Sequence, residues 1–245
     1  MSATVLDITS AVFVLMLWIG YARFARLRAR TSFSVSRALH TQRLYWIKRL
    51  LKRDNRVADV GVLRGIEHSV IFFASSTVLV IGAMLTMLFG KGIVDVEVMN
   101  IHAIAGWVGV PRELKMIGVL LIFIHAFFQF TWAVRQYSFF SVMLGSAPMP
   151  EELPDYTAEE IEDVADDLAR LADRAGHAFN FGLRAWYFAL AFCGWFISPY
   201  AMLVGAIIVV LVLYRREFRS KSLHSMVQSL KRDKLYCEGL SDKLD

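Results

Sequence analysis

Long apolar stretches alternate with charged segments along this chain. Because a membrane span needs about 20 mostly apolar residues, the pattern predicts spans at 5–22, 66–89 and 114–134. A fourth region, 183–213, is apolar apart from Arg184 and is interrupted by Ser198-Pro199-Tyr200. As one helix it would measure about 46 Å, too long for a bilayer without strong tilt. This leaves two alternatives, one proline-kinked span or a hairpin of two spans.

The distribution of basic residues favours the hairpin. Residues 23–64 carry twelve basic residues against Asp54 and Asp59, and basic short loops face the cytoplasm. The tail after Leu213 is also basic, and only a hairpin returns it to that side. We therefore predict an all-α polytopic membrane protein, one integral domain over 1–245, with its N-terminus outside and its C-terminus inside. Its five transmembrane helices are expected at about 5–22, 66–89, 114–134, 178–197 and 200–214.

Composition agrees with a membrane protein. Of 245 residues, 56% are hydrophobic and only 20% are charged, which excludes an ordinary soluble enzyme, a disordered chain and a disulfide scaffold. Cys193 and Cys237 have no metal-site or redox spacing. The first apolar stretch lacks a basic segment before it, so it is interpreted as a retained anchor rather than a secretory signal. The expected location is a bacterial inner membrane.

The cytoplasmic segments carry opposite charges. Within the basic segment 23–64, residues 36–57 have the pattern of a basic amphipathic helix that lies on anionic lipid headgroups, with Trp46 at headgroup level. The tail 215–245 is basic as well. Nucleic acid is not expected as a partner, because the basic loop is tethered to the bilayer and contains no recognised binding motif.

An acidic amphipathic helix is predicted at 157–175. Thr157 and Glu160 fit a capping box, and apolar residues recur on one face. This helix either packs within the chain, on the basic helix or on the ends of the spans, or docks a protein partner or a second copy. The acidic residues that would make such a docking surface are Glu159, Glu160, Asp163, Asp166 and Asp167.

Polar residues inside or beside the spans suggest a binding pocket, because ionisable groups in a membrane are costly. Those expected in the cytoplasmic half are Arg64, His68, Gln129, Arg135, His177, Asn180 and Arg184. Together they would suit an anionic ligand or lipid headgroup. In the alternative interpretation, the arginines extend to the headgroups and the other residues bond to neighbouring helices. Only His68 and His177 match in depth for a haem, and no metal site is predicted.

Four segments carry a resemblance to a known family. They are RVADVGVLR at 56–64, FFASSTVLVIGAM at 72–84, FTWAVRQYSF at 130–139 and HAFNFGLRAWYFAL at 177–190. They resemble a family of uncharacterised membrane proteins of bacteria and plants, known as domain of unknown function 599, over roughly residues 23–220. The resemblance implies a membrane location and several helices, but no activity and no catalytic residue.

The leading functional hypothesis is a non-enzymatic accessory or scaffold subunit of a membrane protein complex, with no cofactor. The second is a lipid or small-anion binding or transport protein that uses the cytoplasmic-side polar residues. The third is a haem-bearing membrane anchor.

Overall fold

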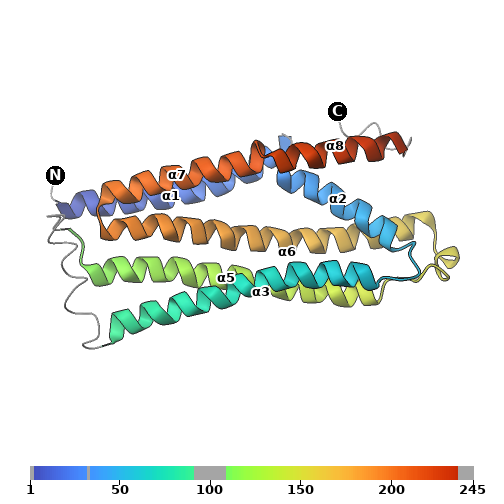
Figure 1. The fold of residues 1–245 in the computed structure, drawn as a ribbon, viewed down its shortest axis with the longest axis horizontal. Helices are drawn as coiled ribbons and strands as arrows, with labels where there is room; N and C mark the ends of the chain where they lie inside the picture. The colour runs from blue at the N-terminus through green and yellow to red at the C-terminus, as the bar shows by residue number, and fades with distance from the viewer. Residues whose placement is uncertain (1–2, 32–33, 91–108, 237–245) are drawn as a thin grey trace.

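The protein is an all-helical bundle. The computed structural model describes residues 3–31, 34–90 and 109–236 (Figure 1), and it is 88% helix, with no strand among those residues. Residues 237–245 of the predicted basic tail, Cys237 among them, lie outside the described part. The helices are α1 (Ala3–Thr31), α2 (Val35–Leu50), α3 (Val57–Phe89), α5 (Arg112–Gly145), α6 (Ala158–Cys193), α7 (Pro199–Phe218) and α8 (Lys221–Tyr236).

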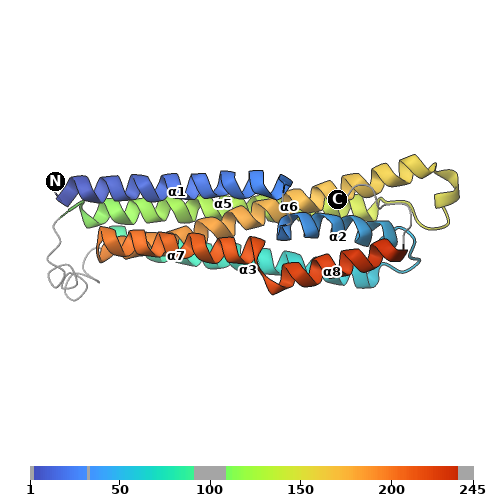
Figure 2. The same cartoon turned by 90° about the horizontal axis from the view of Figure 1, so that it is seen from above.

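Three long helices, α3, α5 and α6, run the whole length of the bundle. Helices α1 and α7 lie side by side along one half, and α2 and α8 lie together along the other half (Figures 1 and 2). The first half contains the apolar stretches and the second contains the basic and acidic helices. The alternation of apolar and charged segments in the sequence therefore separates, in the fold, into an apolar half and a charged half along the long axis of the molecule.

Three helices are long and apolar enough to cross a membrane. They are Ala3–Ala25, Val57–Phe89 and Arg112–Gly145, which contain the first three predicted spans. The segments expected at 178–197 and 200–214 are not among them. A count of five crossings therefore stays a prediction.

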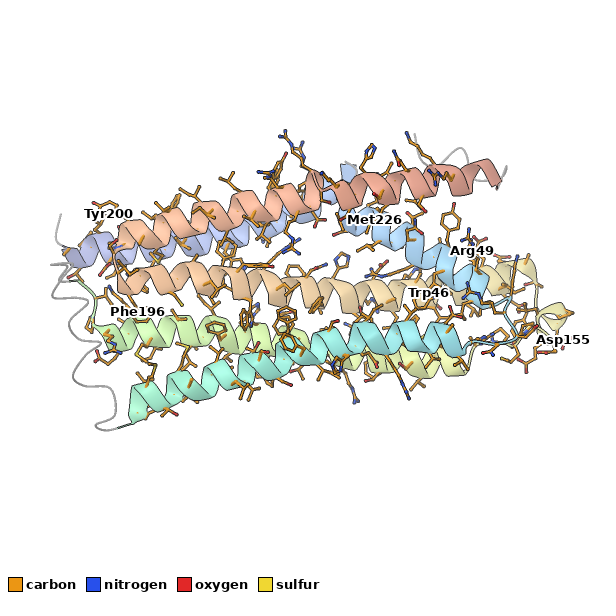
Figure 3. The ribbon with its side chains drawn as sticks, in the orientation of Figure 1. Trp46, Arg49, Asp155, Phe196, Tyr200 and Met226 are labelled. Carbon is orange, nitrogen blue, oxygen red and sulfur yellow. The ribbon has the colours of Figure 1, made fainter. Side chains whose placement is uncertain are left out.

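The region 183–213 is a hairpin of two antiparallel helices rather than one kinked helix. Helix α6 ends at Cys193, a 3₁₀ turn covers Gly194–Phe196, and α7 begins at Pro199. The Ser198 hydroxyl caps α7 by accepting a hydrogen bond from the Ala201 N–H at 3.1 Å, and proline is favoured at the first helical position. A Cβ at Gly194 would lie 3.0 Å from the Ala201 backbone, so glycine allows this close approach of the two helices. Figure 3 shows Phe196 and Tyr200 at this end of the bundle, opposite Asp155.

Helix boundaries differ from the predicted span boundaries. The acidic helix expected at 157–175 and the span expected at 178–197 form one helix, α6. Helix α3 begins nine residues before the expected span at 66, and α5 continues past 134 to Gly145. The predicted tail 215–245 contains the end of α7 and all of α8. Hydropathy marks where a helix leaves the apolar layer, whereas a helix ends only where capping or a breaker stops it.

Helix α2 uses its apolar face inside the protein, which corrects the expectation that Trp46 lies at a membrane surface. Ile47, Leu50 and Leu51 are fully buried in the main core. The Trp46 indole N–H donates to the Asp59 carboxylate at 2.6 Å, and its ring packs 6.2 Å from that of Phe140. Contact of the basic residues with anionic lipid stays a prediction.

Candidate ligand-binding groove

A long groove runs between α1, α5 and α6. Its volume is about 1260 Å³, larger than the roughly 300–1,000 Å³ of sites for drug-sized molecules. Apolar side chains make most of its wall, and these include Leu15, Ile19, Leu114, Ile117 and Leu121. The polar side chains that line it are Arg23, His125, Gln129, Gln136, Arg174 and His177.

None of these six polar side chains forms a hydrogen bond or an ion pair with another residue in the described part of the chain. The His125 ring has one specific contact, an edge-to-face packing on Trp18 with 5.6 Å between ring centroids. An unsatisfied polar group in an apolar environment costs roughly 2–7 kcal/mol. The groove therefore favours an occupant that supplies hydrogen-bond partners.

The contacts between α5 and α6 fix the positions of these residues along the bundle. A Cβ at Gly182 would meet the Phe130 ring at 2.5 Å, and one at Gly118 would lie 3.7 Å from Trp195. These antiparallel contacts place His177 level with Gln136, and thus about 16 Å along the axis from His125. The polar groups form a row that ends in Arg174, and the groove beyond His125 towards Trp195 is apolar. Such a groove is amphipathic along its length.

The structure separates the seven residues predicted to form one pocket. Gln129 and His177 line the groove, whereas Asn180 and Arg184 line a second cavity beside α7. The Arg135 guanidinium lies 4.9 Å above the Phe139 ring on the outer face of α5. Arg64 and His68 are exposed on α3. Two of the seven, therefore, belong to the groove.

Sequence reasoning missed four of the six polar groove residues as ligand-binding candidates, namely Arg23, His125, Gln136 and Arg174. A signal was present for two of them, because His125 and Gln136 share the helical spacing of Gln129 and Trp132 along α5. The sequence did not show that Arg174, in the acidic half of α6, faces the same groove. This became visible only because the predicted acidic helix and the predicted span that follows it form one uninterrupted helix, α6.

The acidic residues of α6 divide into an inner and an outer set. The predicted capping box is confirmed: the Thr157 N–H donates to Glu160 Oε2 at 2.8 Å, and the Glu160 N–H donates to the Thr157 hydroxyl at 3.2 Å. The pKa of Glu160 is lowered because its carboxylate accepts hydrogen bonds from Thr157, first from the backbone N–H and second from the hydroxyl, which also lies at 2.8 Å. Asp166 and Asp167 approach Arg170 at 3.5 and 3.7 Å.

The inner set joins α6 to the basic helix. Lys48 pairs with Glu162 at 2.6 Å, and Arg43 pairs with Asp173 at 2.6 Å. The intramolecular packing that was one of the two interpretations of the acidic helix is thus present. Glu159, Glu160, Asp163 and Asp167 remain exposed on the outer face.

A buried charge cluster at the other end of the bundle was not predicted. Asp7 is 0% exposed and Lys115 is 1% exposed. The Asp7 carboxylate accepts hydrogen bonds from the Val110 N–H at 2.8 Å and the Trp195 indole N–H at 2.9 Å, and it lies 3.3 Å from Lys115 Nζ. Lys115 also donates to the Trp195 carbonyl at 3.1 Å. The cluster ties α1, α5 and the α6–α7 turn together.

A second buried carboxylate holds α2 and α3 together. Asp59 is 2% exposed, and its Oδ1 accepts hydrogen bonds from Trp46 and, at 2.5 Å, from Arg53. Its other carboxylate oxygen has no partner among the described residues. The Arg56 guanidinium donates to the carbonyls of Ala147 and Pro148 just after α5.

The described residues contain no group of three or more metal-ligating side chains. His68 and His177 lie at the same level of α3 and α6, because Trp186 of α6 donates to Thr77 of α3 at 2.7 Å and the two helices are parallel. They lie on different faces, since His68 is exposed and His177 lines the groove. This pair does not frame a haem between them.

The fold and the groove define a helical protein with helices able to cross a membrane and an amphipathic cleft between them. A family model for proteins of unknown function, DUF599, matches residues 9–222. The chain belongs to this uncharacterised family, as its four sequence segments predicted. Comparison with curated proteins and with solved structures gives no match.

Proposed function

We propose that this protein binds an amphipathic, membrane-borne molecule in the groove between α1, α5 and α6. One observation carries the proposal: a row of polar side chains without hydrogen-bond partners lines one end of a groove that is otherwise apolar. A ligand with its polar or anionic head near Arg23, Gln136 and Arg174, and its apolar part beside Ile117 and Leu121, would satisfy both ends.

The role proposed is binding rather than catalysis. The described lining contains histidine, glutamine and arginine but no serine, threonine, cysteine, aspartate or glutamate. It thus offers hydrogen bonds and positive charge, which recognise a head group, without a side chain of the usual nucleophilic kinds beside a base.

We propose five membrane crossings in a bacterial inner membrane, with the N-terminus outside. Support comes from the hairpin of α6 and α7, which brings their turn beside the start of α5 through Lys115. Support also comes from the basic residues of α2 and α8 at the opposite end. The second observation agrees with the positive-inside rule.

Co-purification tests the proposed ligand. The protein would be extracted from its native membrane in mild detergent, and all co-eluting small molecules identified by mass spectrometry. We expect an amphiphile that is retained by the wild type, lost by His177→Leu and retained by His68→Leu. The two variants remove the same side chain at the same level of the bundle, one inside the groove and one outside. Identical small molecules in all three samples would reject the groove as the binding site.

A scaffold role is the second candidate, supported by the exposed acidic face of α6. Glu159, Asp163 and Asp167 are exposed and take no part in the ion pairs with α2, although Asp167 lies 3.7 Å from Arg170 of its own helix. These three carboxylates are therefore accessible to a basic surface of another protein. Neutralising all three to amides is expected to abolish association with a stoichiometric partner, whereas neutralising the exposed Glu151 and Asp155 is not. Retention of the partner by the triple variant would remove this candidate.

A further inference from the structure

We propose that a cavity beside α7, separate from the groove, binds the phosphate group of an anionic lipid or a soluble phosphate ester. Its volume is about 340 Å³, and it shares no lining residue with the groove. It is formed where α2 and α8 begin, against α1, α6 and α7. This volume suits a head group rather than a whole lipid.

Arg184 supplies the first cation of this cavity. Its guanidinium carbon lies 5.7 Å from the centroid of the Tyr21 ring and 5.7 Å from that of the Phe181 ring. It has no hydrogen bond or ion pair with any described residue. Aromatic rings hold a guanidinium through its flat face and leave its N–H groups to acceptors. The arginine is therefore oriented, yet its donors are unused.

Arg216 supplies the second cation. One of its N–H groups donates to the Tyr187 hydroxyl at 2.6 Å, and its guanidinium carbon lies 5.8 Å from the Tyr187 ring centroid. A guanidinium has five N–H donors, so this bond leaves several for a ligand. Arginine pairs are typical of phosphate recognition, because their forked geometry matches the phosphate oxygens.

The acidic residue of the cavity is already engaged. Glu217 accepts hydrogen bonds from the Ser36 hydroxyl at 2.7 Å and from the Ser36 backbone N–H at 3.2 Å. Glu217 thereby accepts a hydrogen bond from a backbone N–H in the first turn of α2. Two guanidiniums against one carboxylate leave a net positive charge, and hydroxyl groups of Ser220 and Ser222 add donors. The cavity is complementary to an anion.

The cavity lies where the apolar stretches end. Helix α1 becomes basic at Arg23, two residues beyond Tyr21, and α7 becomes basic at Arg215. In the proposed topology this is the level of the cytoplasmic headgroups, where anionic lipids attract basic residues. A lipid headgroup and a water-soluble phosphate ester share the chemistry that the two arginines recognise, so the two sources must be separated by experiment.

Native mass spectrometry of the full chain in detergent tests the proposal. The protein would be titrated with dioleoylphosphatidylglycerol and, separately, with dioleoylphosphatidylcholine. We expect Arg184→Gln to lower the affinity for phosphatidylglycerol by roughly tenfold, as the loss of a charged hydrogen bond does. Arg216→Gln should act in the same direction. Arg135→Gln, which removes an arginine stacked on Phe139 outside both cavities, should have no effect.

The soluble probe is glycerol 3-phosphate, measured by calorimetry on the same proteins. Binding that depends on Arg184 and Arg216 would support the proposal with a free phosphate ester as ligand, whereas dependence seen with phosphatidylglycerol alone would support it with a lipid headgroup. Equal lipid and glycerol 3-phosphate binding by Arg184→Gln, Arg216→Gln and Arg135→Gln would overturn the proposal. If Arg184→Gln melts at a lower temperature than the wild type, the binding measured for Arg216→Gln decides the test, because Arg216 is exposed. Neither Arg184 nor Arg216 lines the groove, so we expect both variants to retain the groove ligand, and the two proposals can fail separately.

Discussion

A three-residue charge cluster joins α2 to α6 at the residue scale. The Asp173 carboxylate accepts hydrogen bonds from His40 and Arg43. The hydrogen bond to Asp173 raises the pKa of His40, whereas burial acts in the opposite direction. Burial raises the pKa of Asp173, but the hydrogen bonds from His40 and Arg43 outweigh it and hold that pKa below its ordinary value. Both shifts mean that the charged pair stabilises the folded state.

The stability of the contact between α2 and α6 should therefore depend on pH. Protonated His40 contributes fully below its unfolded pKa of about 6.5, and the contribution is lost as pH rises through the raised folded value. The Asp173 contribution is present above its ordinary pKa and is lost as pH falls through the lowered folded value. Because the His40 side chain is 50% exposed, we expect its effect to be under about 1 kcal/mol.

Thermal melting of the detergent-solubilised protein between about pH 6 and pH 9 measures the His40 effect. His40→Gln should remove the decline in stability across this range. His224→Gln, a change at an exposed histidine that contacts Gln228 in α8, serves as the matched control and should leave the decline intact. An unchanged profile in His40→Gln would contradict the assignment.

The buried pair of Asp7 and Lys115 should dominate stability at the opposite end. Removing one member leaves the other charge buried without its partner, which costs about 3–5 kcal/mol. Asp7→Asn is therefore expected to lower the free energy of unfolding by about that amount, measured by denaturation in mixed detergent. The double variant Asp7→Asn with Lys115→Met should be more stable than Asp7→Asn alone. Additive losses would show that the two residues do not interact.

At the scale of elements, the sequence predicted features that depend on local pattern. The all-helical class, the capping box at Thr157 and the apolar stripe containing Leu168 and Ala175 follow from period and capping chemistry, and the structure confirms each. The break at Ser198-Pro199 likewise marks a real turn.

Features made by contacts between distant segments were not predictable in the same way. Asp7 and Lys115 each looked like a charge at the end of a span, and only folding places them 3.3 Å apart. Gln129 and Arg184 looked like parts of one pocket because depth can be counted along a sequence, whereas the direction in which each side chain faces depends on which helices pack together.

Close packing of α5 on α6 depends on Gly182. A Cβ there would lie 2.5 Å from the Phe130 ring, which is fully buried. Gly182→Ala should destabilise the protein by about 1–3 kcal/mol, the usual cost of overpacking. Gly65→Ala in α3 introduces the same group where nothing lies within 4 Å, and alanine favours a helix by up to about 1 kcal/mol. The unfolding midpoints of the two variants should move in opposite directions. An unchanged midpoint in Gly182→Ala would show that α5 and α6 can move apart to admit the extra methyl group.

At the scale of the whole molecule, the number of crossings can be determined with single cysteines. In a chain lacking Cys193 and Cys237, an impermeant maleimide applied to intact cells should label Glu113→Cys at the start of α5 and Ile197→Cys in the α6–α7 turn. It should label Asp163→Cys and Arg232→Cys only after permeabilisation. The reason is that α2 contacts both α6 and α8, so these two positions share one side of the membrane.

Other labelling patterns would contradict this topology. If Glu113→Cys is labelled in intact cells and Ile197→Cys is protected, the protein crosses the membrane three times and the α6–α7 hairpin does not enter the bilayer. Labelling of Arg232→Cys from outside without labelling of Asp163→Cys would instead require a single last span and would contradict the packing of α8 on α2. The complete reverse of the expected pattern would keep five crossings and invert the protein, placing the cavity of Arg184 and Arg216 in the opposite leaflet.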